Sequence, residues 1–402
     1  MILTFDQALE SLRKEINRNP ISPPVETVPL SHALGRVLAQ DLRADRDYPP
    51  FHRSARDGFA VRSADAIAAP VQLRVIGEAR AGGFFEGSVG PGDCVSIMTG
   101  APVPEGADSV VMVEHTRAEA GEVTLLRPAI ALDNVIPRGS EAATGSRVLS
   151  RGKRIGPGAT GLLASIGAAE ARVFKQPEVA ILPTGDELVP VEASPRWFEI
   201  RNSNSALLAA QVALAGGRAR PLPIAPDNEE QLKRLILDGL SSDLLLLSGG
   251  VSAGKYDLVE KVLGELGAEF YFDGVAIRPG KPLVFGRARN KFFFGLPGNP
   301  ISTYVTFQLF ALPVIRALGG AAFESPLLFG ARLSRPVKRR DGLTAFIPAL
   351  AARENGEPVV TPVAWQGSGD VAGFPAANCF LVVHPDREPP QAGGWVDVLP
   401  KM

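Results

Sequence analysis

Buried strands alternate with helices between residues 177 and 324, and this alternation constrains the fold more than any other feature of the sequence. Three apolar runs there have the length of buried strands: EVAILP (178–183), DLLLLS (243–248) and KFFFGL (291–296). Helical segments are expected at 203–214, 228–240 and 301–318. Strands that alternate with helices of about 10–15 residues are typical of a parallel sheet covered on both faces. We therefore predict a doubly wound α/β domain over this stretch.

The flanking segments have a different pattern. Near the start, Thr4 and Gln7 form a capping box ahead of apolar residues at helical spacing, which predicts a first helix. Residues 25–149 carry short apolar runs broken by Gly and Pro, which indicates a β-rich region. The segment 150–175 is expected to form a turn, a short helix and a strand. Because Gly- and Pro-rich alternation returns later, residues 325–402 are expected to form a small all-β domain.

Composition excludes several classes of protein. The 402 residues carry a net charge of −1, so no global field recruits nucleic acid or an anionic membrane. Cys94 and Cys379 are the two cysteines, too few for a disulfide scaffold, a zinc ribbon or an iron–sulfur cluster. The start has no basic leader segment, and the longest apolar candidate, 307–323, is interrupted by polar residues. We expect a soluble, cytoplasmic protein.

Three polar, Gly-rich loops follow predicted strands: PTGDEL (183–188), SGGVSAGKYD (248–257) and GLPGNP (295–300). In open α/β sheets, ligands bind outside the carboxyl ends of the strands. Since Gly lets backbone N–H groups approach a ligand closely, the three loops predict a pocket for an anionic, phosphorylated ligand.

Two phosphate-binding patterns are near misses. GGVSAGK (249–255) fits GxxxxGK, but Tyr256 stands where Ser or Thr would hold magnesium, so we favour a generic anion-binding loop. GPGATG (156–161) fits GxGxxG, but Pro157 removes a backbone donor from the phosphate-facing turn. We interpret the second pattern as a tight turn into a short helix.

Charged residues gather near the same strand ends. Four carboxylates favour a divalent cation, although helix capping is an alternative use for the first of them: Asp186, Glu187, Asp227 and Asp257. Arg278 and Lys281, in RPGKPLVFG, supply the positive charge that a phosphate or oxyanion site needs.

Polar residues on turns of the β-rich region have two interpretations. Asp57 precedes Gly58, and Thr99 precedes Gly100. Such residues are more often turn formers than catalysts.

Six motifs occur in an order that resembles the MoeA family of molybdenum insertases, which includes the E domain of gephyrin: RSARDGFA, IMTGAPVPEGADSVVMVE, PTGDEL, SGGVSAGKYD, RPGKPLVFG and GLPGNPIS. The resemblance covers nearly the whole chain. It implies an elongated four-domain dimer. The implied parts are a split linker domain (1–47 with 143–176), an inserted β-rich domain (48–142), a MogA-like α/β domain (177–324) and a C-terminal β-barrel (325–402).

The resemblance also implies an activity, in which molybdate and adenylylated molybdopterin give molybdenum cofactor and AMP with the aid of Mg²⁺. It implies catalytic residues, some on the β-rich domain of the other protomer: Asp57, Thr99, Glu141, Glu187, Arg278 and Lys281. It implies residues for the pterin and its phosphate: Thr184, Gly185, Asp186, Ser248, Gly249, Gly250 and Ser252. It places molybdate beside Pro297, Asn299 and Pro300, and the metal near Asp186, Asp227 and Asp257. A MogA-type adenylyltransferase is the implied partner.

Several positions depart from the family pattern. Glu141 stands where Asp is usual, the DSN pattern reads Asn202-Ser203-Asn204, and two lysines are replaced by Gly274 and Arg278. Arg binds an oxyanion but does not imitate a compact ammonium group. One hypothesis is a working insertase with a varied site. Another is a paralogue that binds pterin or nucleotide without full catalysis, or that uses another oxyanion such as tungstate.

Experiments on the chain would separate these alternatives. Lysine at both 274 and 278 is expected to raise turnover only in a weakened enzyme. A third class, a nucleotide hydrolase that uses Lys255, would turn over ATP or GTP without any pterin. A scaffold role like that of gephyrin has no separate signal in the sequence.

Overall fold

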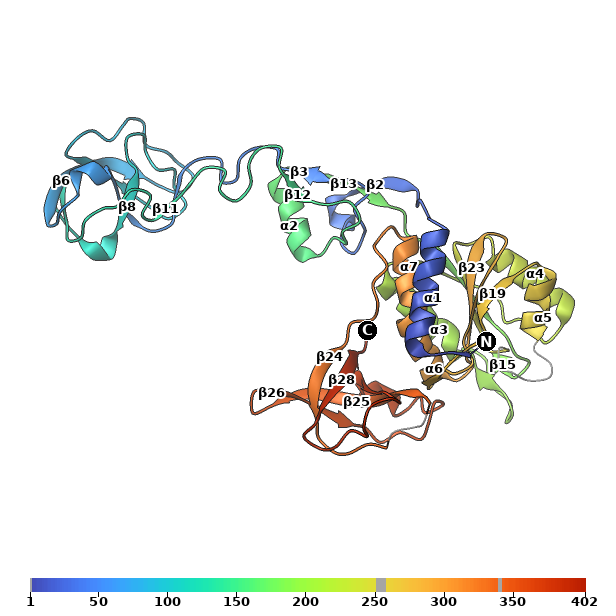
Figure 1. Cartoon of the computed structure of the whole chain (residues 1–402). Coiled ribbons are helices and arrows are strands. Elements are labelled where there is room, and N and C mark those ends of the chain that lie inside the picture. The colour runs from blue at the N-terminus through green and yellow to red at the C-terminus, as the bar shows by residue number, and fades with distance from the viewer. Residues whose placement is uncertain (1, 251–257, 339–341) are drawn as a thin grey trace.

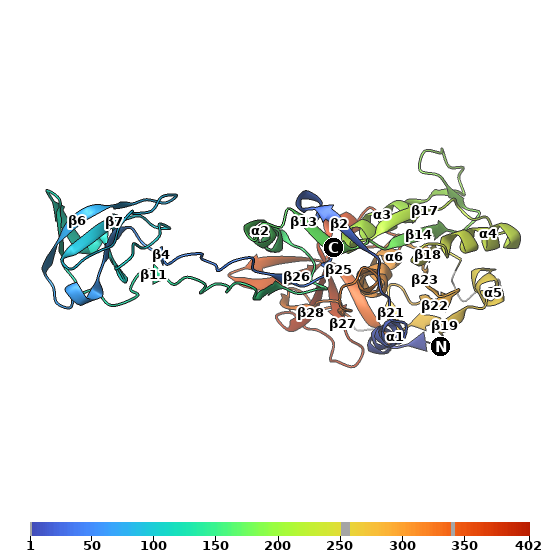
Figure 2. The same ribbon diagram turned by 90° about the horizontal axis from the view of Figure 1, so that it is seen from above.

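The computed structural model describes residues 2–250, 258–338 and 342–402. Ser252, Lys255 and Asp257, which the sequence analysis singled out, lie outside these residues. The chain is elongated: a β-rich lobe stands at one end, and an α/β unit and a barrel lie together at the other (Figure 1). A slender linker joins the two ends, and the same separation is visible from above (Figure 2).

The α/β unit is built on a six-stranded sheet of order β17-β14-β18-β23-β22-β19. Its strands are β14 (Glu178–Pro183), β17 (Arg218–Pro221), β18 (Leu244–Ser248), β19 (Glu269–Phe272), β22 (Val284–Ala288) and β23 (Lys291–Leu296). The first four strands in this order are parallel, as predicted.

One strand departs from the parallel arrangement, because β22 runs antiparallel to both of its neighbours. Arg289 and Asn290 connect β22 to β23, and both have positive φ, 48° and 65°. Two consecutive residues of positive φ form the tight turn that matches the twist of a hairpin, so no crossover helix is needed here.

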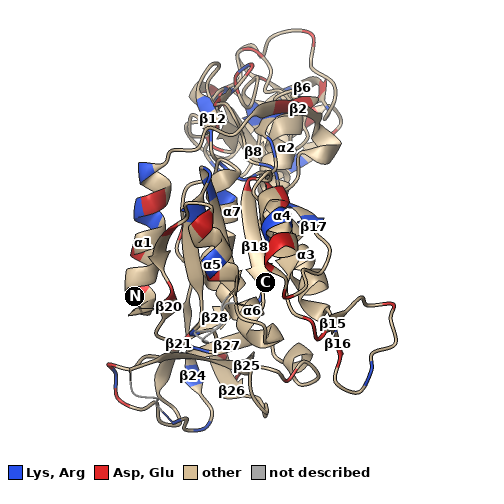
Figure 3. Cartoon of the chain, turned by 90° about the vertical axis from the view of Figure 1, so that its right-hand side faces the viewer, with Lys and Arg blue, Asp and Glu red and all other residues tan. Residues whose placement is uncertain are grey.

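Helices cover both faces of this sheet, which confirms the doubly wound arrangement. Successive side chains of the apolar strands point to opposite faces of the sheet. Ile181 and Leu246 pack with α1 (Phe5–Arg18), α3 (Ser203–Ala215), α6 (Pro300–Thr306) and α7 (Leu312–Leu318). Leu182 and Leu247 pack with α4 (Glu229–Gly239) and α5 (Leu258–Glu265). Figure 3 shows charges of both signs on α1, α4 and α5.

Helix α1 begins at the predicted capping box, in which Thr4 and Gln7 exchange hydrogen bonds. The predicted boundaries place residues 1–47 in the linker domain, but α1 packs into the core of the α/β unit. Its Phe5 ring also meets Phe346 of the barrel edge-on, with 5.5 Å between ring centroids. By packing, the helix therefore belongs with the α/β unit.

The segment Pro300–Leu318 is one continuous helix with a π-helical turn at Phe307–Ala311. Of the described residues, this helix alone is long and apolar enough to cross a membrane by length and composition. However, 83% of it is buried inside the fold, as in the core helix of a folded domain.

The β-rich lobe contains a six-stranded sheet of order β8-β5-β7-β6-β10-β9, as the short apolar runs predict. Its strands are β5 (Gly58–Val61), β6 (Val71–Ala79), β7 (Asp93–Ile97), β8 (Ser109–Met112), β9 (Thr116–Glu119) and β10 (Glu122–Leu125). At its base, β4 (Arg53–Ser54) pairs with β11 (Val135–Ile136).

The linker is made of paired segments that run out to the lobe and back. β2 (Val25–Pro29) pairs with β13 (Glu170–Phe174), and β3 (Leu42–Arg43) pairs with β12 (Arg147–Leu149). Gly156 caps the short helix α2 (Pro157–Ser165), which confirms the interpretation of GPGATG as a turn into a helix. We call residues 44–52 and 137–146, between these strands and the lobe, the neck.

The C-terminal region is a closed five-stranded barrel, in agreement with the predicted all-β domain. Its strands are β24 (Phe329–Leu333), β25 (Thr344–Glu354), β26 (Glu357–Pro362), β27 (Cys379–Val383) and β28 (Trp395–Pro400). The barrel closes because β25 pairs with both β26 and β27. Phe380 and Leu399 of the barrel belong to the same buried cluster as the α/β unit.

Short pairs complete the fold around the α/β unit. β1 (Ile2–Leu3) pairs with β20 (Gly274–Val275), and β15 (Leu188–Val189) pairs with β16 (Ile200–Arg201). β21 (Ile277–Arg278), which lies between β20 and β22 in the chain, pairs with the barrel strand β25. This segment of the α/β unit therefore also belongs to the sheet of the barrel.

Candidate functional site

A cavity of about 580 Å³ lies at the carboxyl ends of the parallel strands, where the sequence predicts a ligand pocket. We call it the carboxyl-edge cavity. The three Gly-rich loops contribute Thr184, Glu187, Ser248, Gly249, Pro297, Gly298 and Asn299. The end of β21 contributes Arg278, the segment after it contributes Lys281, and the barrel contributes Trp365 and Ser368. The predicted convergence of the loops is therefore confirmed for the described residues.

Backbone hydrogen bonds tie the three loops together. The Thr184 N–H donates to the Ser248 carbonyl at 3.0 Å, and the Gly249 N–H donates to the Leu296 carbonyl at 3.2 Å. Each loop therefore begins where the neighbouring strand ends, and the sheet fixes their spacing.

The glycines after β18 are required by their surroundings. Gly249 and Gly250 have φ of +93° and +64°, in the left-handed region. A Cβ at Gly249 would lie 2.6 Å from the Thr184 carbonyl oxygen, and one at Gly250 would lie 2.8 Å from Thr184 Oγ1. The Gly249 N–H is used in the bond to Leu296, whereas the Gly250 N–H donates to no described residue, so the Gly250 N–H is the donor that this turn can offer to an anion.

Asn204 forms part of the cavity wall and is a residue that the sequence analysis did not select. It lies at the start of α3, and its amide nitrogen donates to Ser248 Oγ at 2.8 Å and to the Gly298 carbonyl at 2.7 Å. The only sequence signal was its place in the segment Asn202-Ser203-Asn204, where the sequence departs from the DSN pattern of the MoeA family.

Positive charge faces these loops from the segment 278–281. Arg278 and Lys281 are exposed side chains in the cavity wall, and neither makes an ion pair with a described residue. Between them Gly280 has φ of +107°, and a Cβ there would lie 2.5 Å from Thr306 Cγ2. The close packing of Gly280 on α6 therefore holds the two cations at the cavity.

The loop before α6 is joined to the barrel. Asn299 Nδ2 donates to Ser368 Oγ at 3.0 Å, and the Ile301 N–H donates to the Ser368 carbonyl at 3.1 Å. Asn299 therefore does not cap α6 with its side chain. Pro300 is the first residue of that helix, as the fixed φ of proline allows.

The predicted carboxylates are only partly brought together. Asp186 Oδ1 accepts a hydrogen bond from the Asp227 backbone N–H at 3.0 Å, so these two residues are adjacent. Glu187 lies in the cavity wall with its carboxylate folded over Gly185. Within 2–250, 258–338 and 342–402, no three acidic, His or Cys side chains cluster closely enough to hold a metal. The third predicted ligand, Asp257, lies outside those residues.

Gly274, where the family pattern has a lysine, does not line the carboxyl-edge cavity. It is buried in β20, and a Cβ there would lie 3.1 Å from Ile2 Cγ1. A side chain at 274 would therefore press on Ile2, which would have to shift by a few tenths of an ångström, so the effect of a lysine there on turnover would not isolate a lost charge.

Asp57 and Thr99 meet in the β-rich lobe. Asp57 Oδ1 accepts hydrogen bonds from the Thr99 N–H at 2.6 Å and from the Thr99 hydroxyl at 2.9 Å. Both bonds lower the pKa of Asp57 below its usual value, and the bond from the Thr99 backbone has the larger effect. Glu141 is elsewhere engaged, since it pairs with Arg53 at 3.1 Å near the base of the lobe. The structure thus joins two of the three residues predicted there.

A second cavity, of about 640 Å³, lies at the opposite edge of the sheet, by the amino ends of β14 and β23. Two of its cations are in ion pairs, since Arg218 bonds to Glu178 and Lys291 bonds to Asp243 at 3.0 Å. Lys175 and Arg287 also line it, and neither pairs with a described acidic residue. The three Gly-rich loops lie at the carboxyl ends of the strands, where open α/β sheets bind their ligands, and none of their described residues lines this second cavity. We therefore assign the functional site to the carboxyl-edge cavity.

Comparisons with known proteins agree with this geometry. Three family models match the chain, described as the MoeA N-terminal region (domain I and II) over 3–167, a probable molybdopterin binding domain over 180–317 and the MoeA C-terminal region (domain IV) over 330–401. The molybdopterin molybdenumtransferase of Bacillus subtilis strain 168 is 37% identical over 93% of this chain and 89% of its own. The protein of that name from Haemophilus influenzae is 34% identical over 99% of this chain and 98% of its own.

Solved structures lead to the same group. The molybdopterin biosynthesis MoeA protein of Pyrococcus horikoshii OT3 matches the whole of both chains with a TM-score of 0.80 at 28% identity. A second crystal structure of a Pyrococcus MoeA protein gives 0.75 at 32% identity, again over both whole chains.

Proposed function

Because the chain belongs to the MoeA family of molybdopterin molybdenumtransferases, we propose that it inserts molybdenum from molybdate into adenylylated molybdopterin and releases AMP. It is then a transferase of molybdenum cofactor biosynthesis, with molybdopterin and molybdenum as its substrates. Identity over nearly the full length of molybdenumtransferases does not favour a non-catalytic paralogue.

The observation that carries this proposal is that two cations, neither in an ion pair with a described residue, line the same cavity as the strand-end loop at Gly249. Arg278 and Lys281 line a cavity of about 580 Å³ together with the left-handed Gly249, and the left-handed Gly250 follows it directly in the chain. That volume suits a ligand of substrate size, and both features favour phosphate or oxyanion groups. Cleavage of a pyrophosphate bond depends mainly on positioning and charge neutralisation, so a nucleophilic side chain is not needed.

We assign the substrate groups to the walls as follows. The pterin and its phosphate would contact the first two loops: Thr184, Gly185, Asp186, Ser248, Gly249, Gly250 and Ser252. Molybdate would bind by Pro297, Asn299 and Pro300, next to Arg278, Lys281 and the barrel residue Ser368. Support comes from the bond between Asn299 and Ser368, which joins the loop before α6 to the barrel at the cavity wall.

Magnesium is part of the proposal, and the donor set fits it. Asp186 and Asp227 are adjacent exposed carboxylates, and Mg²⁺ commonly uses one or two carboxylates together with waters and substrate phosphates. Asp257 would be a further ligand. A bound Mg²⁺ would neutralise phosphate charge while Arg278 and Lys281 hold the oxyanion.

A homodimer is also proposed, in which the lobe of one protomer completes the cavity of the other. In one chain the Asp57–Thr99 pair lies at the far end of the molecule from the α/β unit (Figure 1). If Asp57, Thr99 and Glu141 contribute to the reaction together with Glu187, they must come from a partner. We further propose a MogA-type adenylyltransferase as the supplier of substrate, and the cytoplasm as the location.

The test is AMP release from adenylylated molybdopterin with Mg²⁺, measured with and without molybdate. We expect release that depends on molybdate. Tight binding of the pterin without release would contradict the proposal.

A matched pair of variants locates the reaction in that assay. Arg278→Met should lower turnover about 10- to 100-fold, the range for losing a charge-assisted hydrogen bond. Arg353→Gln, an exposed position on β25, should leave turnover unchanged.

A further inference from the structure

A buried amide lies at the point where two of the three loops meet. Asn204 is 9% exposed, and its amide nitrogen bonds to both Ser248 Oγ and the Gly298 carbonyl. Because a carbonyl can only accept, the bond to Gly298 identifies the atom of Asn204 that is nitrogen. Asn204 therefore donates to Ser248, and not the reverse.

This bond decides what Ser248 can do. A hydroxyl oxygen that accepts from Asn204 keeps its own hydrogen for another partner. Ser248 is 2% exposed and lines the carboxyl-edge cavity, and its hydroxyl donates to no described residue. The Ser248 O–H is thus left as a donor at the start of the Gly249-Gly250 turn.

Two other atoms of the wall have no partner among the described residues: Asn204 Oδ1 and Thr184 Oγ1. An unpaired buried polar group costs about 1–3 kcal/mol of stability. Two such oxygens beside one cavity call for an explanation, and a bound ligand with donor groups would supply one.

A purely structural role for Asn204 is the alternative. Its bond to Gly298 joins two loops, and that tie alone would justify an asparagine. However, a Cβ at Gly298 would lie 3.8 Å from Gly249 Cα, so the loops already touch there. The backbone bond from Gly249 to Leu296 joins them as well.

We propose that Asn204 is a positioning residue that orients the Ser248 hydroxyl as a donor to the phosphate of the bound pterin. The inference rests on the proposed function, because it takes the phosphate of molybdopterin as the acceptor. Phosphate is favoured over a neutral group since the left-handed glycines follow Ser248 directly and two unpaired cations line the same cavity.

The experiment measures binding of adenylylated molybdopterin by anaerobic calorimetry. Asn204→Leu has a similar shape but no donor, and it should weaken binding about 10-fold or more, as loss of a bond to a charged group does. Asn202→Asp is the matched control, because Asn202 caps α3 two residues earlier without contact to Ser248. Its affinity should match that of the wild type.

A double-mutant cycle with Ser248→Ala separates the two roles. If Asn204 acts through Ser248, Asn204→Leu should cost little further affinity once the hydroxyl is gone. Additive effects, or unchanged binding by Asn204→Leu, would overturn the inference. Should Asn204→Leu not fold, Asn204→Asp serves in its place, since its carboxylate would accept the Ser248 hydrogen and repel phosphate.

Failure of the proposed function has a different signature. In that case the wild-type protein itself would not bind adenylylated molybdopterin, whereas failure of the inference leaves wild-type binding intact and removes only the difference between variants.

Discussion

The turn at Gly249 and Gly250 depends on the absence of side chains at both residues. At Gly249 and Gly250 the missing Cβ atoms leave room for the carbonyl and hydroxyl of Thr184, which pack beneath the turn. Thr184 also donates its N–H to the carbonyl of Ser248, the residue before the turn. Thr184 therefore both packs against the turn and bonds to the strand that leads into it. A change of one carbon at either glycine therefore strains the whole turn.

Gly250→Ala tests this at the residue scale. With φ of +64° and a Cβ 2.8 Å from Thr184 Oγ1, the variant should lose about 1–2 kcal/mol of unfolding free energy, the usual cost of a left-handed L-residue. Its affinity for adenylylated molybdopterin should also fall. Chemical denaturation and calorimetry measure the two effects.

Gly161→Ala is the matched control for that prediction. Gly161 lies inside helix α2 with nothing within 4 Å of its missing Cβ. Alanine there should raise stability by about 1 kcal/mol or less. Equal losses in both variants would mean that glycine at 250 has no special role.

Residues on the loops could be predicted from the sequence, whereas Asn204 could not. Thr184, Ser248 and Gly249 follow apolar runs directly, so the strand pattern places them at the sheet edge. Asn204 opens a helix, and its importance arises only when that helix start meets two loops about 44 and 94 residues further along. Sequence spacing does not encode such a meeting.

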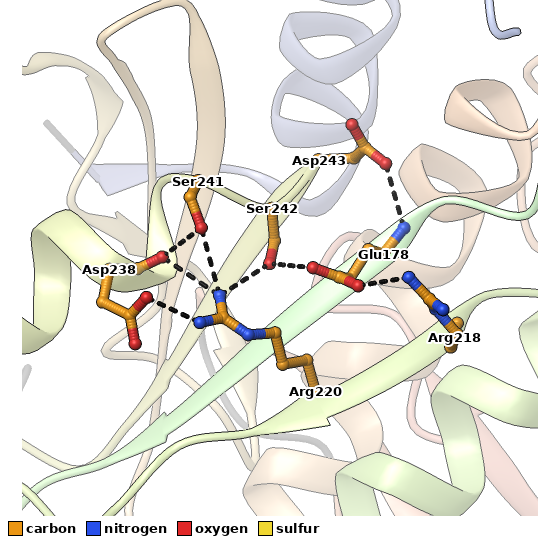
Figure 4. Close-up of polar contacts among 7 residues, drawn as sticks. All are labelled: Glu178, Arg218, Arg220, Asp238, Ser241, Ser242 and Asp243. Atoms are coloured by element: carbon orange, nitrogen blue, oxygen red, sulfur yellow. Dashed lines mark hydrogen bonds and ion pairs between the residues drawn. The ribbon is translucent and has the colours of Figure 1, made fainter.

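At the scale of elements, the amino edge of the sheet is held by a chain of polar contacts (Figure 4). Arg220 on β17 donates to the Asp238 carboxylate and carbonyl, and to the hydroxyls of Ser241 and Ser242. Ser242 in turn donates to Glu178 at the start of β14. One arginine thus joins the end of α4, the turn after it and two strands.

Arg220→Ala tests the importance of this junction. The Arg220 side chain is about one third exposed, so solvent weakens its charged hydrogen bonds. We therefore expect the variant to lose about 1–2 kcal/mol of unfolding free energy. Denaturation with urea measures the loss. AMP release under native conditions should be unchanged, because the junction lies at the edge opposite the carboxyl-edge cavity.

Arg234→Ala is the comparison, since Arg234 is exposed on the same helix α4. Its effect should stay within about 0.5 kcal/mol, as for ordinary surface positions. If Arg220→Ala were equally harmless, the contacts in Figure 4 would be incidental.

The order of elements could largely be predicted from the sequence, whereas the antiparallel direction of β22 could not. Apolar runs and helical spacing predict the α/β alternation, the first helix and the all-β ends. They do not distinguish a parallel strand from a hairpin strand, because both are short and buried. The direction of β22 is decided by Arg289 and Asn290, whose positive φ values have no signature in an apolar pattern.

At the scale of the whole molecule, the α/β unit, α1 and the barrel share one buried cluster, while the lobe has clusters of its own. The sequence could suggest an inserted β-rich segment by its motifs. It could not place that segment relative to the carboxyl-edge cavity, since the position depends on the neck.

Mixed dimers test whether the site is shared between protomers. Asp57→Asn and Arg278→Met should each reduce AMP release as homodimers. If every cavity uses the lobe of the other protomer, a mixed dimer carries one intact site, and random mixing should restore about a quarter of wild-type activity. No recovery on mixing would mean that each site is built within one chain, or that Asp57 has no part in it.

The neck has a mechanical consequence. Its two segments run side by side, joined by Tyr48 N–H to the Ala142 carbonyl at 2.8 Å and by Asp47 to the Thr144 N–H and hydroxyl. A double-stranded arm resists twisting about its length more than a single strand does. The lobe that carries Asp57 and Thr99 lies at the outer end of this arm. A small change in the angle of the neck near β3 and β12 would therefore move these two residues over a much larger distance.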